Sequence, residues 1–199
     1  MIGNLYLWGN ICQYVSSYYK INQGDPNASN SKAILILPLS FTVQACFNPV
    51  GAFLQKKMNP KILMIMGSTV CISSLYLASL MTTWVWFVFF YAVCFPIGVG
   101  LSYWTPILCG YEWYPKRKGM VSGIIIGAFG FGAFIFGFLT KALVNPNNLS
   151  PSGTDDEKYY DFDTSSRVPR MFHICIVIWT VLMTIGSLLI SRSPEYVRE

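Results

Sequence analysis

The sequence predicts an all-α, polytopic membrane protein, a bundle of six transmembrane helices. Two observations carry this prediction. Of the 199 residues, 53% are hydrophobic and only 12% are charged, whereas about a quarter of the residues of an ordinary soluble domain carry a charge. The apolar residues also gather in long blocks, and a block of about 20 apolar residues is what a helix needs to cross ~30 Å of hydrocarbon.

Six apolar blocks follow one another in a single transmembrane domain that takes in residues 1–199. The predicted spans are residues 1–19, 33–54, 62–81, 84–109, 119–144 and 171–190. The first block is the most polar, because several Asn, Gln and Ser residues interrupt it. Residues 145–170 are rich in Asn, Ser, Pro, Asp and Gly, so we expect them to form a loop outside the membrane, on the extracytoplasmic side.

The distribution of Lys and Arg predicts the orientation of the bundle. Residues 55–61 and 111–118 are short and strongly basic, and basic loops of this kind are retained on the cytoplasmic side during insertion. Both chain ends then face the cytoplasm, and residues 20–32 and 145–170 lie outside. The acidic residues of these outer segments are Asp25, Asp155, Asp156, Glu157, Asp161 and Asp163, and their glycosylation sequons begin at Asn27 and Asn148.

Several functional classes are not supported by the composition. The six cysteines stand singly, without a CxxC pair, and are expected to be reduced packing residues. The basic residues lie in short loops rather than in a patch with interleaved aromatics, so nucleic acid is not an expected partner. The one histidine, His173, is expected to be interfacial. Because no acid–base pair or ligand cluster can be proposed, we predict no enzyme, no cofactor and no metal.

Polar side chains recur on one face of the first helix at intervals of three and four residues. These are Tyr6, Asn10, Gln13, Tyr14 and Ser17. Polar side chains are costly against lipid, so this face is expected to line a cavity or to contact another helix. The second and fourth helices add Gln44, Asn48, Tyr91, Ser102 and Tyr103. Three helices with polar faces favour a substrate pathway, although a polar seam between helices is an equal alternative for the first helix alone.

The fifth predicted helix carries a nearly continuous face of small residues. Its glycines are Gly119, Gly123, Gly127, Gly130 and Gly137. Small residues at this spacing let two helices approach closely, so we interpret this face as a packing surface rather than a ligand site. Prolines within or near the ends of apolar blocks, such as Pro49 and Pro96, are expected to bend their helices.

Four stretches of the chain carry a resemblance to a known family, and one of them, Gly98-Val99-Gly100 with Tyr103, is similar to the family's fourth helix. The run Glu112 to Ala133, EWYPKRKGMVSGIIIGAFGFGA, resembles the fourth loop and fifth helix of the oxalate/formate antiporter and monocarboxylate porter branch of the major facilitator superfamily. Gly3 to Gly9, GNLYLWG, looks like the first-helix signature of that branch. Gly51 to Lys61, GAFLQKKMNPK, resembles the superfamily's loop between helices two and three. The matching positions of the two cytoplasmic loops are Gly51, Lys56, Lys61, Lys116 and Arg117.

The resemblance implies a fold and a function. The family has twelve helices in two six-helix halves, so this chain would be the amino-terminal half, with its first helix beginning part way through. It would carry a small organic anion, such as a monocarboxylate, across the lipid bilayer by alternating access, as an antiporter does, together with a carboxy-terminal half or a second copy. The chain departs from the family at Gln55, where Asp is usual, and at Met58, where Gly is usual.

An alternative of another class remains open. The chain could be a non-transporting structural or assembly subunit of a membrane complex, or a truncated inactive fragment. Both alternatives share with the transporter the prediction of a multi-pass integral membrane protein, in the plasma membrane or an organelle membrane.

Overall fold

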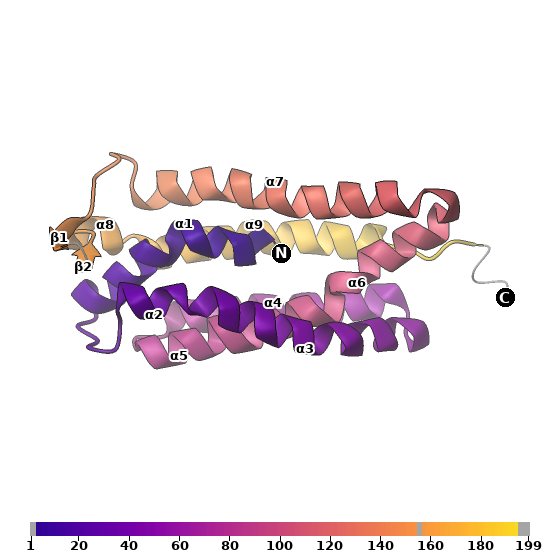
Figure 1. Ribbon diagram of the computed structural model, residues 1–199, viewed down its shortest axis with the longest axis horizontal. Helices are drawn as coiled ribbons and strands as arrows, with labels where there is room; N and C mark the ends of the chain where they lie inside the picture. The colour runs from indigo at the N-terminus through magenta and orange to yellow at the C-terminus, as the bar shows by residue number, and fades with distance from the viewer. Residues whose placement is uncertain (1–2, 155–156, 195–199) are drawn as a thin grey trace.

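The computed structural model describes residues 3–154 and 157–194 and confirms an all-α membrane bundle whose long helices run side by side (Figure 1). Asp155 and Asp156, counted above among the outer acidic residues, lie outside the described residues, as do the first two residues of the first predicted span. The elements in chain order are α1 (Gly3–Ser17), α2 (Asn30–Ile34), α3 (Ile36–Lys57), α4 (Pro60–Leu80), α5 (Trp84–Val88), α6 (Phe95–Trp113), α7 (Lys118–Val144), β1 (Ser152–Thr154), β2 (Glu157–Tyr159), α8 (Phe162–Ser165) and α9 (Val168–Leu189).

Five helical stretches of the described chain are long and apolar enough to cross a bilayer. They are Asn30–Lys57, Pro60–Leu80, Trp84–Trp113, Pro115–Val144 and Phe162–Leu189. The first predicted span differs, because α1 has 15 residues and is therefore roughly 22 Å long. It continues as a π-helical turn over Tyr18–Asn22, and its polar side chains lower its hydropathy.

The helix that contains α5 and α6 is interrupted by a π-helical turn over Phe89–Cys94. This turn leads directly into Pro96, which has no backbone N–H and whose ring clashes with the carbonyl four residues earlier. A π turn is a usual way for a helix to absorb such a break. The stretch Trp84–Trp113 therefore spans as one unit with an irregularity in its first half.

An aromatic core joins α1 to the π-helical turn before α6 and to α9. The ring centroids of Trp8 and Tyr91 are 4.8 Å apart, and those of Phe87 and Tyr91 are 5.3 Å apart. Phe172 of α9 closes the cluster, 6.0 Å from Phe87. The indole N–H of Trp8 donates to the backbone carbonyl of Ala33 at 2.8 Å, so the one polar group of this buried ring is satisfied.

Close helix packing in this half of the bundle depends on glycines of α3, α4 and α6. A Cβ at Gly51 would lie 2.5 Å from the carbonyl oxygen of Leu101. A Cβ at Gly98 would lie 2.7 Å from the carbonyl oxygen of Gly67, and one at Gly67 would lie 2.9 Å from the carbonyl oxygen of Gly98. No real Cβ tolerates such distances to backbone, so α6 can approach α3 and α4 this closely only through glycine.

The two basic loops lie at the same end of the bundle. Arg192, which follows α9, donates hydrogen bonds to the carbonyl oxygens of Gln55 and Met58 in the turn between α3 and α4. Trp113, at the end of α6, donates to the carbonyl oxygen of Ser191 at 3.0 Å. These bonds hold the residues after α9 between the loops at residues 55–61 and 111–118.

The opposite end carries more structure than the predicted loop at residues 145–170. Strands β1 and β2 form an antiparallel hairpin in which Ser152 pairs with Tyr159 and Thr154 pairs with Glu157. The short helix α8 follows, and α9 begins at Val168, ahead of the predicted start at residue 171. Composition alone indicated a loop because strands of three residues leave little hydrophobic pattern to detect.

Candidate functional site

A pocket of about 290 Å³ lies between α1 and α7, and two residues of the predicted polar stripe line it. Its lining residues are Asn10, Tyr14, Phe134, Gly137, Phe138 and Lys141. An amide, a phenol, an ammonium group and two aromatic rings therefore line the same small pocket. Among these lining residues none is acidic, so the pocket has a positive character.

Gly137 creates the space for this arrangement. A Cβ at this position would lie 2.9 Å from Nδ2 of Asn10, closer than real Cβ atoms come to a side chain. The glycine therefore lets the amide of Asn10 reach the surface of α7. The other glycines predicted to form a packing face have open space beside them. A Cβ added at Gly119, Gly123, Gly127 or Gly130 would meet no atom of the described chain within 4 Å.

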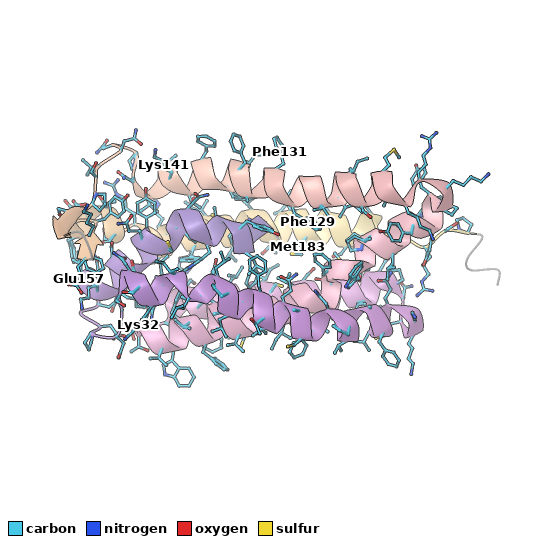
Figure 2. All side chains as sticks on the ribbon, in the orientation of Figure 1. Lys32, Phe129, Phe131, Lys141, Glu157 and Met183 are labelled. Carbon is cyan, nitrogen blue, oxygen red and sulfur yellow. The ribbon has the colours of Figure 1, made fainter. Side chains whose placement is uncertain are left out.

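The sequence interpretation missed Lys141, which supplies the charge of this pocket. It lies in the last turn of α7 and is exposed. Figure 2 shows it at the end of α7, near the hairpin, far from the two basic loops. A signal was present, because Phe134, Gly137 and Lys141 follow one another at intervals of three and four and so share one helix face. This spacing places the ammonium group of Lys141 on the helix face that contains Gly137.

The hairpin closes one end of the polar stripe. Nε2 of Gln13 donates to the carbonyl oxygen of Lys158 at 3.1 Å, and the backbone N–H of Tyr160 donates to Oγ of Ser17 at 3.0 Å. The rings of Tyr14 and Tyr160 lie 4.5 Å apart. Burial and the neighbouring Tyr14 raise the pKa of Tyr160 to about 12, so its hydroxyl stays protonated at neutral pH.

Tyr6 and Tyr103 lie farther along the bundle, toward the basic end. Tyr6 is 53% exposed, and its ring lies 5.6 Å from that of Phe41 on α3. The ring of Tyr103 on α6 lies 5.9 Å from that of Phe129 on α7. Figure 2 shows Phe129 on the side of α7 that faces the bundle and Phe131 pointing away from it. These ring contacts join α1 to α3 and α6 to α7.

The predicted polar residues of α3 lie on its buried side. Gln44 is 6% exposed, and the carbonyl oxygen of its backbone lies beside Gly100 of α6. Oε1 of Gln44 and Oδ1 of Asn48 are buried and find no hydrogen-bond partner among the described residues. An unpaired buried amide oxygen is costly, and such groups are a reason to look for a missing partner or ligand.

Tyr91 and Ser102 lie outside the pocket between α1 and α7. Tyr91 is 2% exposed within the aromatic core described above. The hydroxyl of Ser102 donates to the carbonyl oxygen of Gly98 at 2.8 Å, where α6 packs against Gly67 of α4. The structure brings Asn10 and Tyr14 together in the pocket, whereas these two residues lie in helix contacts.

The residues of the two predicted cytoplasmic loop motifs are distributed over helices and a turn. Gly51 and Lys56 lie within α3, and Lys61 lies in the first turn of α4. Lys116 and Arg117 lie in a 3-10 turn over Pro115–Arg117. Gln55, which stands where the family usually has Asp, is 3% exposed and contacts the carbonyl oxygen of Thr105 through its side-chain amide at 3.4 Å.

No family model matches the sequence. Apicoplast pyruvate carrier 1 of Toxoplasma gondii is 29% identical over an alignment of 233 residues. The alignment takes in 95% of this chain and 43% of that protein. The fujikurins efflux protein of Gibberella fujikuroi is 27% identical over 135 residues, 67% of this chain and 29% of that protein. The MFS-type transporter opdF of Penicillium oxalicum is 23% identical over 137 residues, 69% of this chain and 32% of that protein.

The chain spans less than half the length of each of these relatives. All three are described as carriers, transporters or efflux proteins, and none as an enzyme. With its spanning helices, the chain is a multi-pass integral membrane protein, and its relatives support a membrane transporter family.

Proposed function

We propose that this chain forms one six-helix half of a major facilitator type carrier, in the oxalate/formate and monocarboxylate branch, that moves a small organic anion across the membrane by alternating access. The observation that carries the proposal is the pocket between α1 and α7, where Lys141 meets Asn10 and Tyr14 beside two phenylalanines. A carboxylate is the expected partner of an ammonium with neighbouring hydrogen-bond donors, and the phenylalanine rings suit a short apolar substituent.

A monocarboxylate is the substrate class that fits this chemistry best. It offers one negative charge for one ammonium, and a pocket of about 290 Å³ suits a small molecule. The relative named as a pyruvate carrier supports this choice, because it matches 95% of the chain. In this proposal the substrate passes along the side chains of the polar faces on α1, α3 and α6.

A second half completes the path. Of the residues at the apolar heart of Pro115–Val144 only 6% are buried, against 50% for Trp84–Trp113. The glycine face of α7 is therefore open in this chain, and a carboxy-terminal half or a second copy would cover it. We further propose that the end with the two basic loops faces the cytoplasm, because short basic loops stay on that side.

Uptake of labelled pyruvate into proteoliposomes tests the proposal. The chain is reconstituted alone and together with a carboxy-terminal half, and uncharged pyruvamide serves as a matched competitor. We expect saturable uptake that unlabelled pyruvate inhibits and pyruvamide does not. Absence of saturable uptake in both reconstitutions would refute the transport proposal, and equal inhibition by pyruvamide would refute the anion specificity.

A further inference from the structure

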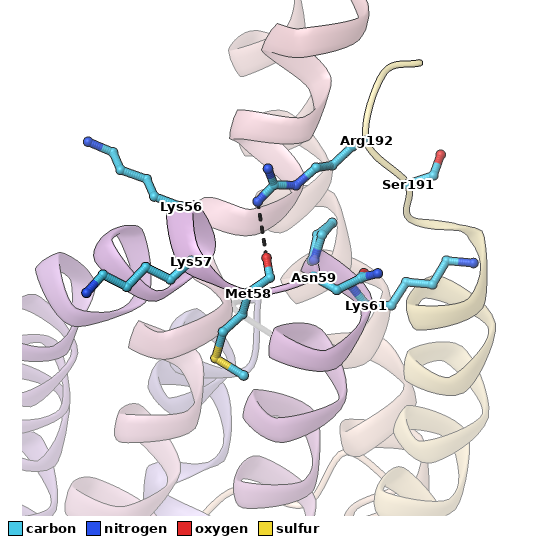
Figure 3. Close-up of a pocket in the computed structure, with 8 residues that line it drawn as sticks. Lys56, Lys57, Met58, Asn59, Lys61, Ser191 and Arg192 are labelled. Carbon is cyan, nitrogen blue, oxygen red and sulfur yellow. Dashed lines mark hydrogen bonds between the residues drawn. The ribbon is translucent and has the colours of Figure 1, made fainter. Parts of the chain in front are cut away.

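A second pocket lies at the basic end of the bundle, between the turn that joins α3 to α4 and the residues that follow α9 (Figure 3). Its volume is about 380 Å³. Its lining residues include four cations, Lys56, Lys57, Lys61 and Arg192, together with Asn59 and Ser191, and none of the residues that line it is acidic. A concave site with this charge is suited to an anion.

Hydrogen bonds hold the wall of this basic pocket in place. Arg192 donates to the carbonyl oxygen of Met58, as Figure 3 shows, and also to that of Gln55. These two bonds fix the residues after α9 against the turn. Oδ1 of Asn59 accepts from the backbone N–H of Lys61 at 2.9 Å and so caps the start of α4. The N-terminus of α4 adds the partial positive charge of a helix start to that of the side chains.

The three lysines lie on two sides of the pocket, and their ammonium groups point outward rather than toward Arg192. Figure 3 shows Lys61 on the side of Ser191, with Lys56 and Lys57 reaching out from the end of α3 on the other side of Met58. The ammonium of Lys57 lies 4.4 Å from the ring centroid of Phe53. The cations therefore surround an area at the end of the bundle rather than converge on a single point, which suits a phosphate carried on a larger headgroup.

Apolar side chains continue from the basic pocket along the membrane-spanning helices. Phe53, one turn before Lys57, is 56% exposed, and Ile62, next to Lys61, is 51% exposed. Ile65, one turn farther along α4, is also 51% exposed. A cationic pocket above exposed apolar helix faces fits a ligand with a negative head and hydrocarbon tails, and it does not fit a fully soluble anion equally well.

We propose that this pocket binds the phosphate-bearing headgroup of an anionic phospholipid, whose acyl chains lie along the exposed apolar residues of α3 and α4. The site is separate from the pocket between α1 and α7, which lies toward the opposite end of the bundle, and the proposal does not depend on transport. A lipid bound here bridges the turn between α3 and α4 to the residues after α9.

Quenching by brominated lipids tests the proposal on the purified chain in lipid nanodiscs. The fluorescence of Trp113, which bonds to Ser191 beside the pocket, is measured with brominated phosphatidylserine and with brominated phosphatidylcholine. The test variant is Lys56→Gln with Lys61→Gln. The matched control is Lys116→Gln with Arg117→Gln, which removes the same charge from the same end of the bundle outside the pocket. Replacing the other five tryptophans with Phe in all proteins isolates the signal.

We expect the unmodified chain to prefer phosphatidylserine and the test variant to lose that preference. A hydrogen bond from a lysine ammonium to a phosphate oxygen contributes a factor of about ten in affinity, so the test variant, which loses such bonds in the pocket, is expected to lose the preference at least tenfold. Lys56→Arg with Lys61→Arg should restore it, and the control variant should keep it. Equal losses in the test and control variants would overturn the proposal, since they would show general surface attraction alone.

Inorganic phosphate and glycerophosphoserine separate a lipid from a soluble anion. We expect neither, at millimolar concentration, to displace brominated phosphatidylserine, because neither has acyl chains to contact Phe53 and Ile62. Displacement by inorganic phosphate at low millimolar concentration would overturn the assignment to a lipid. Circular dichroism of each variant verifies its helix content. If the Gln variant does not fold, the test is repeated by comparing the Arg variant with a variant that carries Lys56→Met and Lys61→Met.

Discussion

Nδ2 of Asn10 lies 2.9 Å from the point that a Cβ at Gly137 would occupy. Glycine at this position is therefore what brings the amide of α1 against α7 and shapes the pocket between them. The other α7 glycines of the predicted face have open space around them in the described chain. One helix face thus contains two kinds of glycine, one that shapes a pocket and others that are available to a second half.

Gly137→Ala is expected to impair uptake without unfolding the protein. The added methyl group pushes the flexible end of Asn10 out of the pocket, while alanine favours the helix by about 1 kcal/mol over glycine. We expect the KM for pyruvate to rise several-fold in the proteoliposome assay, with unchanged thermal unfolding. The matched control is Gly186→Ala on α9, where an added Cβ would meet no described atom within 4 Å. If Gly137→Ala transports like the unmodified chain, the pocket does not contact the substrate.

Lys141→Gln is expected to reduce uptake of the anion at least tenfold. The substitution keeps a hydrogen-bond donor on a side chain one atom shorter but removes the one positive charge that lines the pocket between α1 and α7. A hydrogen bond to a charged group contributes about 1.5–3 kcal/mol, and each 1.4 kcal/mol is a factor of ten. Uptake of pyruvate measures the effect. Lys141→Arg keeps the positive charge and should therefore retain part of the uptake.

Lys32→Gln provides the control for this loss of charge. Lys32 lies at the same end of the bundle as Lys141 but away from the pocket, as Figure 2 shows. We expect its substitution to leave the KM for pyruvate within about twofold, because exposed charges at a distance are screened by salt. Equal effects of the two substitutions would assign the role of Lys141 to the general surface potential.

The sequence was informative wherever a pattern stays within one helix. The spacing of Asn10, Gln13 and Tyr14 predicted a polar face on α1, and the structure places all three at contacts with α7 or the hairpin. Six apolar blocks were predicted to span, and the last five of them coincide with the five spanning stretches of the described chain. Each of these features depends on the helical repeat, which can be read from neighbouring positions alone.

Features that join distant parts of the chain could not be predicted. The bond from Gln13 to the carbonyl oxygen of Lys158 links positions 145 residues apart, and periodicity contains no information about such pairs. Glycine content alone favoured a packing face on α7, whereas the close contacts form at Gly51, Gly67 and Gly98. A glycine's use depends on which helix lies opposite, and that is a property of the tertiary fold.

Ser17→Ala is expected to release the hairpin locally. Oγ of Ser17 accepts the backbone N–H of Tyr160, and the serine is fully buried, so alanine leaves that N–H without its acceptor. A loss of about 1 kcal/mol in local stability follows. Hydrogen exchange at residues 157–161 should become several-fold faster, while global thermal unfolding changes little. Ser73→Ala is the control, since its hydroxyl bonds carbonyls of its own helix. Unchanged exchange in Ser17→Ala would show that other contacts hold the hairpin.

Asp25 is expected to make the hairpin end of the bundle sensitive to acid. Burial by itself raises the pKa of this carboxyl, but hydrogen bonds from the backbone N–H groups of Trp84 and Asn27 outweigh that effect, so the pKa lies below its ordinary value. Oδ2 accepts from Trp84 at 2.7 Å and Oδ1 from Asn27 at 2.8 Å. The bonds thus tie residues 20–32 to the start of α5.

A lowered pKa in the folded state means that ionised Asp25 stabilises the fold. This contribution is fully present above the pKa of about 3.9 that Asp has in an unfolded chain, and it is lost as the pH falls through the lower folded pKa. Asp25→Asn should therefore lower the melting temperature at pH 7 and flatten its decline below about pH 4. Thermal unfolding followed by tryptophan fluorescence measures both, with the exposed Asp163→Asn as control. If Asp25→Asn retains the full acid dependence of the unmodified chain, another carboxyl group is responsible.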